Sequence, residues 1–199
     1  METMRIKKWE LAMLLALCIT LCCGVWADAR SKQLSSGLIR LHVIADSDSD
    51  VEQQVKLAVR DRVIDMLGPR LDGVQNISEA RSVLESSMDD IKSAAEEIAG
   101  ERSINVTLGL ENYPTRQYDG FSLPAGEYTS LRVIIGSGEG HNWWCVVFPP
   151  LCTDASQLVS GDISCLSNDD IALITESDGG YVIKFRILEL WGRLVEKLK

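Results

Sequence analysis

Three cysteines in the last third of the chain, Cys145, Cys152 and Cys165, are the residues best suited to carry chemistry. A catalytic thiolate needs a base, and the chain has only two histidines, His42 and His141. His141 would lie roughly 13 Å from Cys145 along an extended strand, which leaves His42 as the candidate base. A cysteine hydrolase using Cys145 and His42 is therefore one hypothesis. The bulky apolar neighbours of Cys145 disfavour a thiolate and favour an inert or bridged sulfur.

A disulfide between Cys145 and Cys152 is the second hypothesis for these sulfurs. An extended chain would hold them roughly 20 Å apart, so the bridge requires a sharp reversal at Pro149-Pro150. Cys165 is an alternative partner for either one. A zinc site is not expected, because six residues between two cysteines is not a ligand spacing and histidines are scarce. We expect no metal and no cofactor.

The acidic run DSDSD at residues 46–50 resembles the start of a calcium-binding loop. The resemblance fails at the sixth position, where Val51 replaces the required glycine, and at the twelfth, where Leu57 replaces the bidentate glutamate. The run is better explained as a helix start, where Ser and Asp cap backbone N–H groups and favour the helix dipole.

The N-terminal segment predicts export. Three basic residues precede an apolar run at residues 11–25, and small residues at Ala27 and Ala29 offer a cleavage site, so residues 1–29 are a signal peptide or an uncleaved membrane anchor. Its charges cancel, so the exported part carries the full net charge of −9. That charge argues against nucleic acid as a partner, and the membrane is expected to be met only through the N-terminal segment.

Hydrophobic periodicity predicts a strand followed by two helices. Residues 38–45 alternate between apolar side chains and Arg40 and His42. A capping box of Ser49 and Glu52 begins the first helix, and Gly68-Pro69 is expected to end it. The second helix is expected to run from Asn76 to Gly100.

Three further strands are expected at residues 103–111, 126–136 and 141–148, forming an antiparallel meander whose last two strands are joined by a hairpin. The fold class is therefore α+β, with the helices packed on one sheet face. Residues 30–199 are expected to form a single exported domain, in which 153–180 is loop-rich and 182–198 is an amphipathic C-terminal helix.

Two surfaces are candidates for partner binding. One is polar and surrounds the first strand and the acidic helix start. The other is an apolar strip at the last strand, where alternation puts the two tryptophans on opposite faces. Their members are Arg40, His42, Asp46 and Asp48 for the first, and Trp143, Trp144, Pro149 and Pro150 for the second.

Three stretches of the exported part resemble the stage II sporulation protein R family: residues 39–61, residues 113–152 and KFRILELW at 184–191. One departure is Asp46, where the family usually has Asn. The resemblance implies a signalling protein made in the forespore and secreted across its membrane into the intermembrane space. There it would trigger a membrane-embedded aspartic protease of the mother cell, which removes the pro-sequence of pro-sigma-E. It implies a signal and not an enzyme. A cysteine hydrolase and a cell-envelope binding module are the alternatives.

Overall fold

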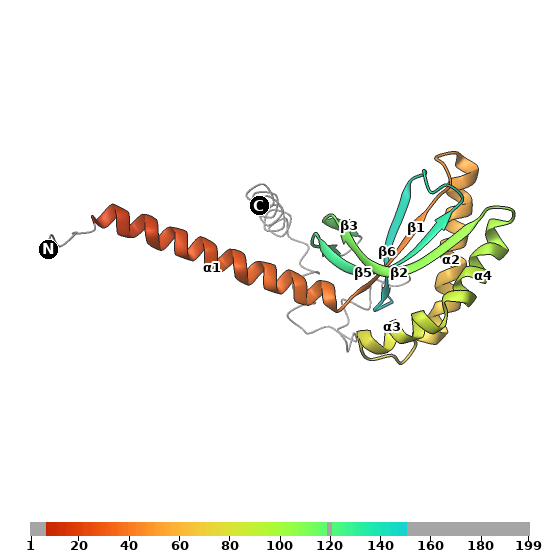
Figure 1. The fold of residues 1–199 in the computed structure, drawn as a ribbon, viewed down its shortest axis with the longest axis horizontal. Coiled ribbons are helices and arrows are strands. Elements are labelled where there is room, and N and C mark those ends of the chain that lie inside the picture. The colour runs from red at the N-terminus through yellow and green to blue at the C-terminus, as the bar shows by residue number, and fades with distance from the viewer. Residues whose placement is uncertain (1–6, 119–120, 151–199) are drawn as a thin grey trace.

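The computed structural model describes residues 7–118 and 121–150. Figure 1 shows one long helix leading into a sheet that is backed by three further helices. The elements in chain order are α1 (Lys8–Ser36), β1 (Ile39–Ile44), α2 (Asp50–Leu71), α3 (Ile77–Ser86), α4 (Met88–Ala99), β2 (Ile104–Tyr113), β3 (Arg116–Tyr118), β4 (Phe121–Leu123), β5 (Gly126–Ile135) and β6 (Asn142–Phe148). The predicted α+β class is confirmed.

The main sheet is mixed, and the predicted three-strand meander is wrong. The strand order is β2-β5-β1-β6, with β1 parallel to β5 and antiparallel to β6. β1 therefore lies between the two strands that were expected to form a hairpin. All six residues of β1 are buried, and a strand covered on both faces belongs in the middle of a sheet.

The glycine-rich segment between β5 and β6 steps over the end of β1 instead of making a tight turn. Its backbone bonds to the chain that leaves β1: Glu139 N–H donates to the Asp46 carbonyl over 3.2 Å, and Gly140 N–H to the Ala45 carbonyl over 2.9 Å. Two strand spacings amount to about 10 Å, which five or six residues can cross. The same signal of Gly and Ser fits a hairpin, so sequence could not separate the two connections.

Both predicted helix starts are confirmed, and so is the predicted end at Gly100, which is the C-cap of α4. The predicted end of the first helix and the continuity of the second need correction. The Ser49 side chain accepts a hydrogen bond from Glu52 N–H, and the Asn76 side chain accepts one from Glu79 N–H. α2 continues through Pro69 to Leu71, because a proline so near the end forfeits a single backbone bond while Leu71 gains a buried position. The expected second helix is two helices, α3 and α4, that meet at Ser87.

The larger core lies between the sheet and α2, α3 and α4. Strand side chains from alternate positions meet apolar residues of the helices, including Ile39, Leu41, Val43, Val59, Val63, Leu67, Leu84, Ile91, Leu131 and Val133. A bulge near the start of β1 shifts the register of β6, so that Val147 and Phe148 both join this core. Strict alternation would have placed Phe148 on the opposite face.

The sequence predicted helices on one sheet face only, which would leave the other face uncovered. In the structure that other face is covered as well. A hairpin of the short strands β3 and β4, which sequence reasoning missed, forms a second core there together with the end of α1. Leu34 of α1 and Leu38 are almost fully buried in it. The last turn of α1 is thus part of the folded domain.

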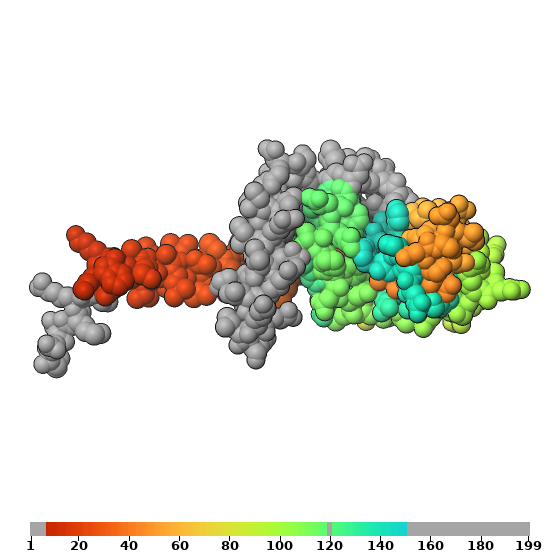
Figure 2. Space-filling model, turned by 90° about the horizontal axis from the view of Figure 1, so that it is seen from above, coloured from red at the N-terminus to blue at the C-terminus, as the bar shows by residue number. Residues whose placement is uncertain are grey.

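In its N-terminal part, α1 stands clear of the sheet and the other helices (Figure 2). Its 29 residues make it long enough, and its composition apolar enough, to cross a membrane, and none of its most apolar stretch is buried. This agrees with a signal peptide or an anchor. Ala27 and Ala29, the expected cleavage points, lie inside the continuous helix. The predicted loop-rich region 153–180 and the C-terminal helix 182–198 lie outside the described residues.

Candidate functional site

β1 points Arg40 and His42 toward the sheet face that lies away from α2 and α4. The odd-numbered residues of the strand enter the larger core, and these two side chains enter the opposite layer. Arg40 is 0% exposed and His42 is 5% exposed. The structure therefore places the predicted polar surface, at these two residues, in the interior beneath the β3–β4 hairpin.

Arg40 is enclosed by three tyrosines. Its guanidinium carbon lies 4.1 Å from the ring centre of Tyr113, 5.1 Å from that of Tyr128 and 5.7 Å from that of Tyr118. One Nη also donates to the Tyr118 hydroxyl. Aromatic faces attract a cation most strongly where water is excluded, so this cage offsets part of the cost of burying the charge. Burial raises the pKa of Tyr113 and of Tyr128, which keeps both hydroxyls protonated.

His42 is linked to an acid on β2. Its Nδ1 lies 3.0 Å from Glu111 Oε1, and because a carboxylate can only accept, Nδ1 carries the hydrogen. Ser130 on β5 donates to the other carboxylate oxygen over 2.8 Å, and the Tyr113 hydroxyl lies 2.6 Å from Ser130 Oγ. Burial by itself raises the pKa of Glu111, but the Ser130 hydrogen bond and the nearby His42 outweigh it and hold that pKa below its ordinary value of 4.5.

Asp46 and Asp48 fasten the start of α2 to the loop before β6. Asp46 accepts from Ser137 N–H over 2.6 Å, and Asp48 accepts from the backbone N–H of His141 over 2.6 Å and also contacts its ring. These bonds lower the pKa of both carboxyls below 3.8. Both aspartates therefore bond to the loop between β5 and β6, and the expected capping of α2 is found at Ser49 instead.

The two tryptophans lie on opposite faces of β6, as alternation predicts. Trp143 is 38% exposed, and the Arg60 guanidinium of α2 lies 4.4 Å from its ring centre. Trp144 is half-buried on the Arg40 face, between the Arg116 guanidinium at 3.6 Å and the His42 ring at 5.5 Å. The predicted apolar strip is therefore divided between two surfaces.

The two prolines follow β6 directly. The Phe148–Pro149 peptide bond is cis. Pro150 and Val147 line a small cavity of about 260 Å³ against the last turns of α2. This places Pro150 beside the helix layer.

Cys145 cannot be the nucleophile of a Cys145–His42 pair in this fold. Cys145 is the register partner of Leu41, and His42 is the partner of Trp144, so the sulfur and the imidazole lie on opposite faces of the sheet. Cys145 is also disulfide-bonded. The cysteine hydrolase hypothesis at these two residues is therefore wrong. The predicted pairing with Cys152 lies outside the described residues and stays a prediction.

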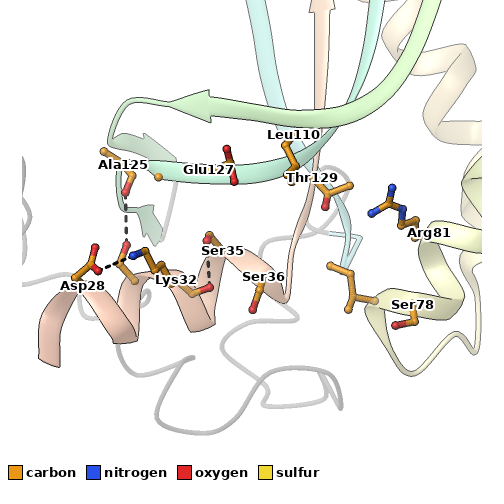
Figure 3. Close-up of a pocket in the computed structure, with 13 residues that line it drawn as sticks. Asp28, Lys32, Ser35, Ser36, Ser78, Arg81, Leu110, Ala125, Glu127 and Thr129 are labelled. Carbon is orange, nitrogen blue, oxygen red and sulfur yellow. Dashed lines mark hydrogen bonds and ion pairs between the residues drawn. The ribbon is translucent and has the colours of Figure 1, made fainter. Parts of the chain in front are cut away.

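A second cavity, of about 460 Å³, lies where α1 meets the sheet (Figure 3). Ser31 of α1 donates to the Ala125 carbonyl over 3.5 Å, and Lys32 pairs with Asp28 one helical turn away. Arg81 of α3 and Glu127 of β5 line the other sides. Two acids and two bases balance its lining, so the cavity selects no charge.

No group of three or more metal-ligating side chains occurs within residues 7–118 and 121–150. Sequence reasoning found Arg40 and His42 but missed the residues that surround them: Tyr113, Tyr118, Tyr128, Glu111, Ser130, Arg116 and Arg132. Glu111 is the last residue of the strand expected at residues 103–111, and Tyr113 lies just beyond that expected end. The signal that could have found Glu111 and Tyr113 is the alternation of this strand continued past residue 111. It puts Thr107, Gly109, Glu111 and Tyr113 on one face of the strand.

Comparison with known proteins identifies the family. The family model described as stage II sporulation protein R matches residues 35–157, more than half of the chain. A curated relative, stage II sporulation protein R of Bacillus subtilis (strain 168), is 39% identical over 118 residues. The matched region covers 57% of this chain and 53% of the relative, so it spans about half of the relative's length. No solved structure matches.

Proposed function

Because the chain belongs to the stage II sporulation protein R family, we propose that it is the intercompartmental signal of endospore formation. The family supports a role in sporulation signalling. In the proposal, the protein is made in the forespore and exported into the space between the two membranes. There it triggers the membrane aspartic protease of the mother cell that cleaves pro-sigma-E. The observation that carries the proposal is the family match across residues 35–157, which takes in all of the sheet.

Two properties of the molecule support export. α1 is an apolar helix at the N-terminus, and its most apolar part touches nothing else in the described chain. Cys145 is disulfide-bonded, which fits a compartment outside the reducing cytoplasm. Cleavage after Ala27 or Ala29 would leave Leu34 in place, so the domain keeps its second core whether or not the segment is removed.

The proposal is of a signal that acts through binding. Cys145 and His42 do not form a nucleophile–base pair, because His42 contacts Glu111 and lies across the sheet from Cys145. A binding role needs a surface of fixed shape, and the cage of Arg40 and three tyrosines provides a rigid base for one.

Gene deletion in the sporulating host tests the proposal. Deletion should leave pro-sigma-E unprocessed on an immunoblot and stop development at the asymmetric septum, and a wild-type copy expressed in the forespore should restore both. Normal processing in the deletion strain would reject the proposal. N-terminal sequencing of the exported protein is expected to begin after Ala27 or Ala29, whereas an intact Met1 in the membrane fraction would identify α1 as an anchor.

A further inference from the structure

Four side chains of the Arg40 face carry buried nitrogen atoms without a hydrogen-bond partner. They are Arg40 at Nε and Nη1, His42 at Nε2, Arg116 at Nε and Arg132 at Nε, and within the described residues no other buried side-chain atom lacks a partner. Three of the four side chains are arginines, whose N–H groups can only donate. Buried donors are nearly always satisfied, so a cluster of unsatisfied ones requires an explanation.

These side chains form a continuous row across the sheet. His42 on β1 is the register partner of Arg132 on β5 and of Trp144 on β6. Arg116 of the hairpin stacks on Trp144 at 3.6 Å. Arg40 lies beneath, two residues before His42 on the same strand. The unsatisfied nitrogens therefore belong to neighbouring groups and not to scattered positions.

The row is positively charged in a chain whose net charge is −9. Glu111 is the acid that reaches it among the described residues, and its oxygens already accept from Ser130 and His42. Arg132 Nε lies 3.9 Å from Glu111, too far for a hydrogen bond. Three guanidinium groups thus face one carboxylate, and the free energy of the cluster would fall if a further acceptor arrived.

The side chains of the row differ in exposure to solvent. Arg40 and His42 are buried, whereas Arg132 is 39% exposed at its side chain and Arg116 and Trp144 are half-buried. Other atoms of Arg116 and Arg132 are exposed, whereas their Nε atoms are buried, so both guanidinium groups have to turn toward a ligand for Nε–H to donate to it.

We propose that the Arg116–His42–Arg132 row binds a carboxylate of an acidic protein segment. The two carboxylate oxygens accept hydrogen bonds from Arg116 and Arg132, and the buried charge of Arg40 adds to the attraction. That the acidic segment belongs to the receptor protease rests on the proposed function. The binding site does not rest on the proposed function, because it is inferred from the unsatisfied donors and the excess of cations.

Titration of the full chain in detergent micelles with glutarate, a mimic of an acidic side chain, tests the site. The NMR signals of the Arg116 and Arg132 Nε–H groups should shift saturably with glutarate and not with chloride at the same ionic strength. Arg116→Gln and Arg132→Gln should each weaken glutarate binding about tenfold, as expected for loss of one charge-assisted hydrogen bond. Arg62→Gln is the matched control, because Arg62 pairs with Glu97 on the far side of α2, and its binding should equal that of the wild type.

Three results would overturn the site: no saturable shift, equal affinity in the two variants and the wild type, or tighter binding of inorganic phosphate than of glutarate. Arg116→Lys and Arg132→Lys guard against misfolding, since they keep the charge and should still bind more weakly than wild type through loss of the planar fork. If glutarate binds but the deletion strain processes pro-sigma-E normally, the site stands and the proposed function falls. If processing requires the chain but no glutarate binds, the reverse holds.

Discussion

The imidazole of His42 on β1 lies 3.0 Å from the carboxylate of Glu111 on β2, although β5 separates these two strands in the sheet. The contact is possible because Ser130, on the strand between them, is small and donates to the same carboxylate. The buried layer of the Arg40 face is thus tied together across three strands by one acid.

Glu111→Gln should lower the free energy of unfolding by about 1–3 kcal/mol, because it leaves the His42 and Arg132 groups without their anion while keeping the side chain's shape. Urea unfolding at pH 7 measures the change. Glu97→Gln is the control, since Glu97 is exposed and its ion pair with Arg62 should contribute at most about 1 kcal/mol. Equal losses in the two variants would show that the buried network does not stabilise the fold.

Acid should destabilise the protein through the carboxyls whose pKa is lowered in the folded state. Asp46, Asp48 and Glu111 have this shift, so the unfolded chain binds more protons than the folded one as the pH falls through about 4. Their contribution is complete near neutral pH and is lost on acidification. Asp46→Asn, whose amide oxygen can still accept from Ser137, should lose less stability between pH 7 and pH 3 than wild type. Urea midpoints measure the stability at each pH. An equal loss of stability in Asp46→Asn and wild type would contradict a contribution of the Asp46 carboxyl to acid destabilisation.

Gly140→Ala should disrupt the crossing over the end of β1. A Cβ at this position would lie 2.6 Å from the carbonyl carbon of Ser47, and backbone cannot give way as a flexible side chain can. We expect a loss of about 1–3 kcal/mol in the free energy of unfolding. Gly109→Ala is the control, since nothing lies within 4 Å of its added Cβ. If Gly140→Ala were as stable as Gly109→Ala, the close packing of this loop on Ser47 would be refuted.

Features of the fold that depend on residues near in sequence were predictable, and the pairing of strands distant in sequence was not. The caps at Ser49 and Asn76 and the alternation of residues 39–44 depend on near neighbours, and the structure confirms them. The position of β1 between β5 and β6 depends on a crossing connection that looks like a hairpin in sequence. Arg40 and His42 were expected on a polar surface, whereas the structure buries both, Arg40 among tyrosines far along the chain.

Substitution of the two tryptophans should separate the two faces of β6. Trp144→Ala should lower the free energy of unfolding by about 3 kcal/mol, because the ring fills space between Arg116 and His42. Trp143→Ala should cost less and keep signalling, since Trp143 lies on the face away from the Arg116–His42–Arg132 row. Loss of pro-sigma-E processing in a Trp143→Ala strain whose protein melts normally would instead place the partner on the α2 side.

Reconstitution tests the signalling role most directly. The membrane aspartic protease and pro-sigma-E would be assembled in lipid vesicles, with the substrate inside, and the purified chain would be added outside. The account predicts that pro-sigma-E is cleaved when the folded chain is added, and that chain unfolded by reduction and heat has no effect. Cleavage at the same rate without the chain, or no cleavage with the folded chain beside a protease shown to be active, would contradict it.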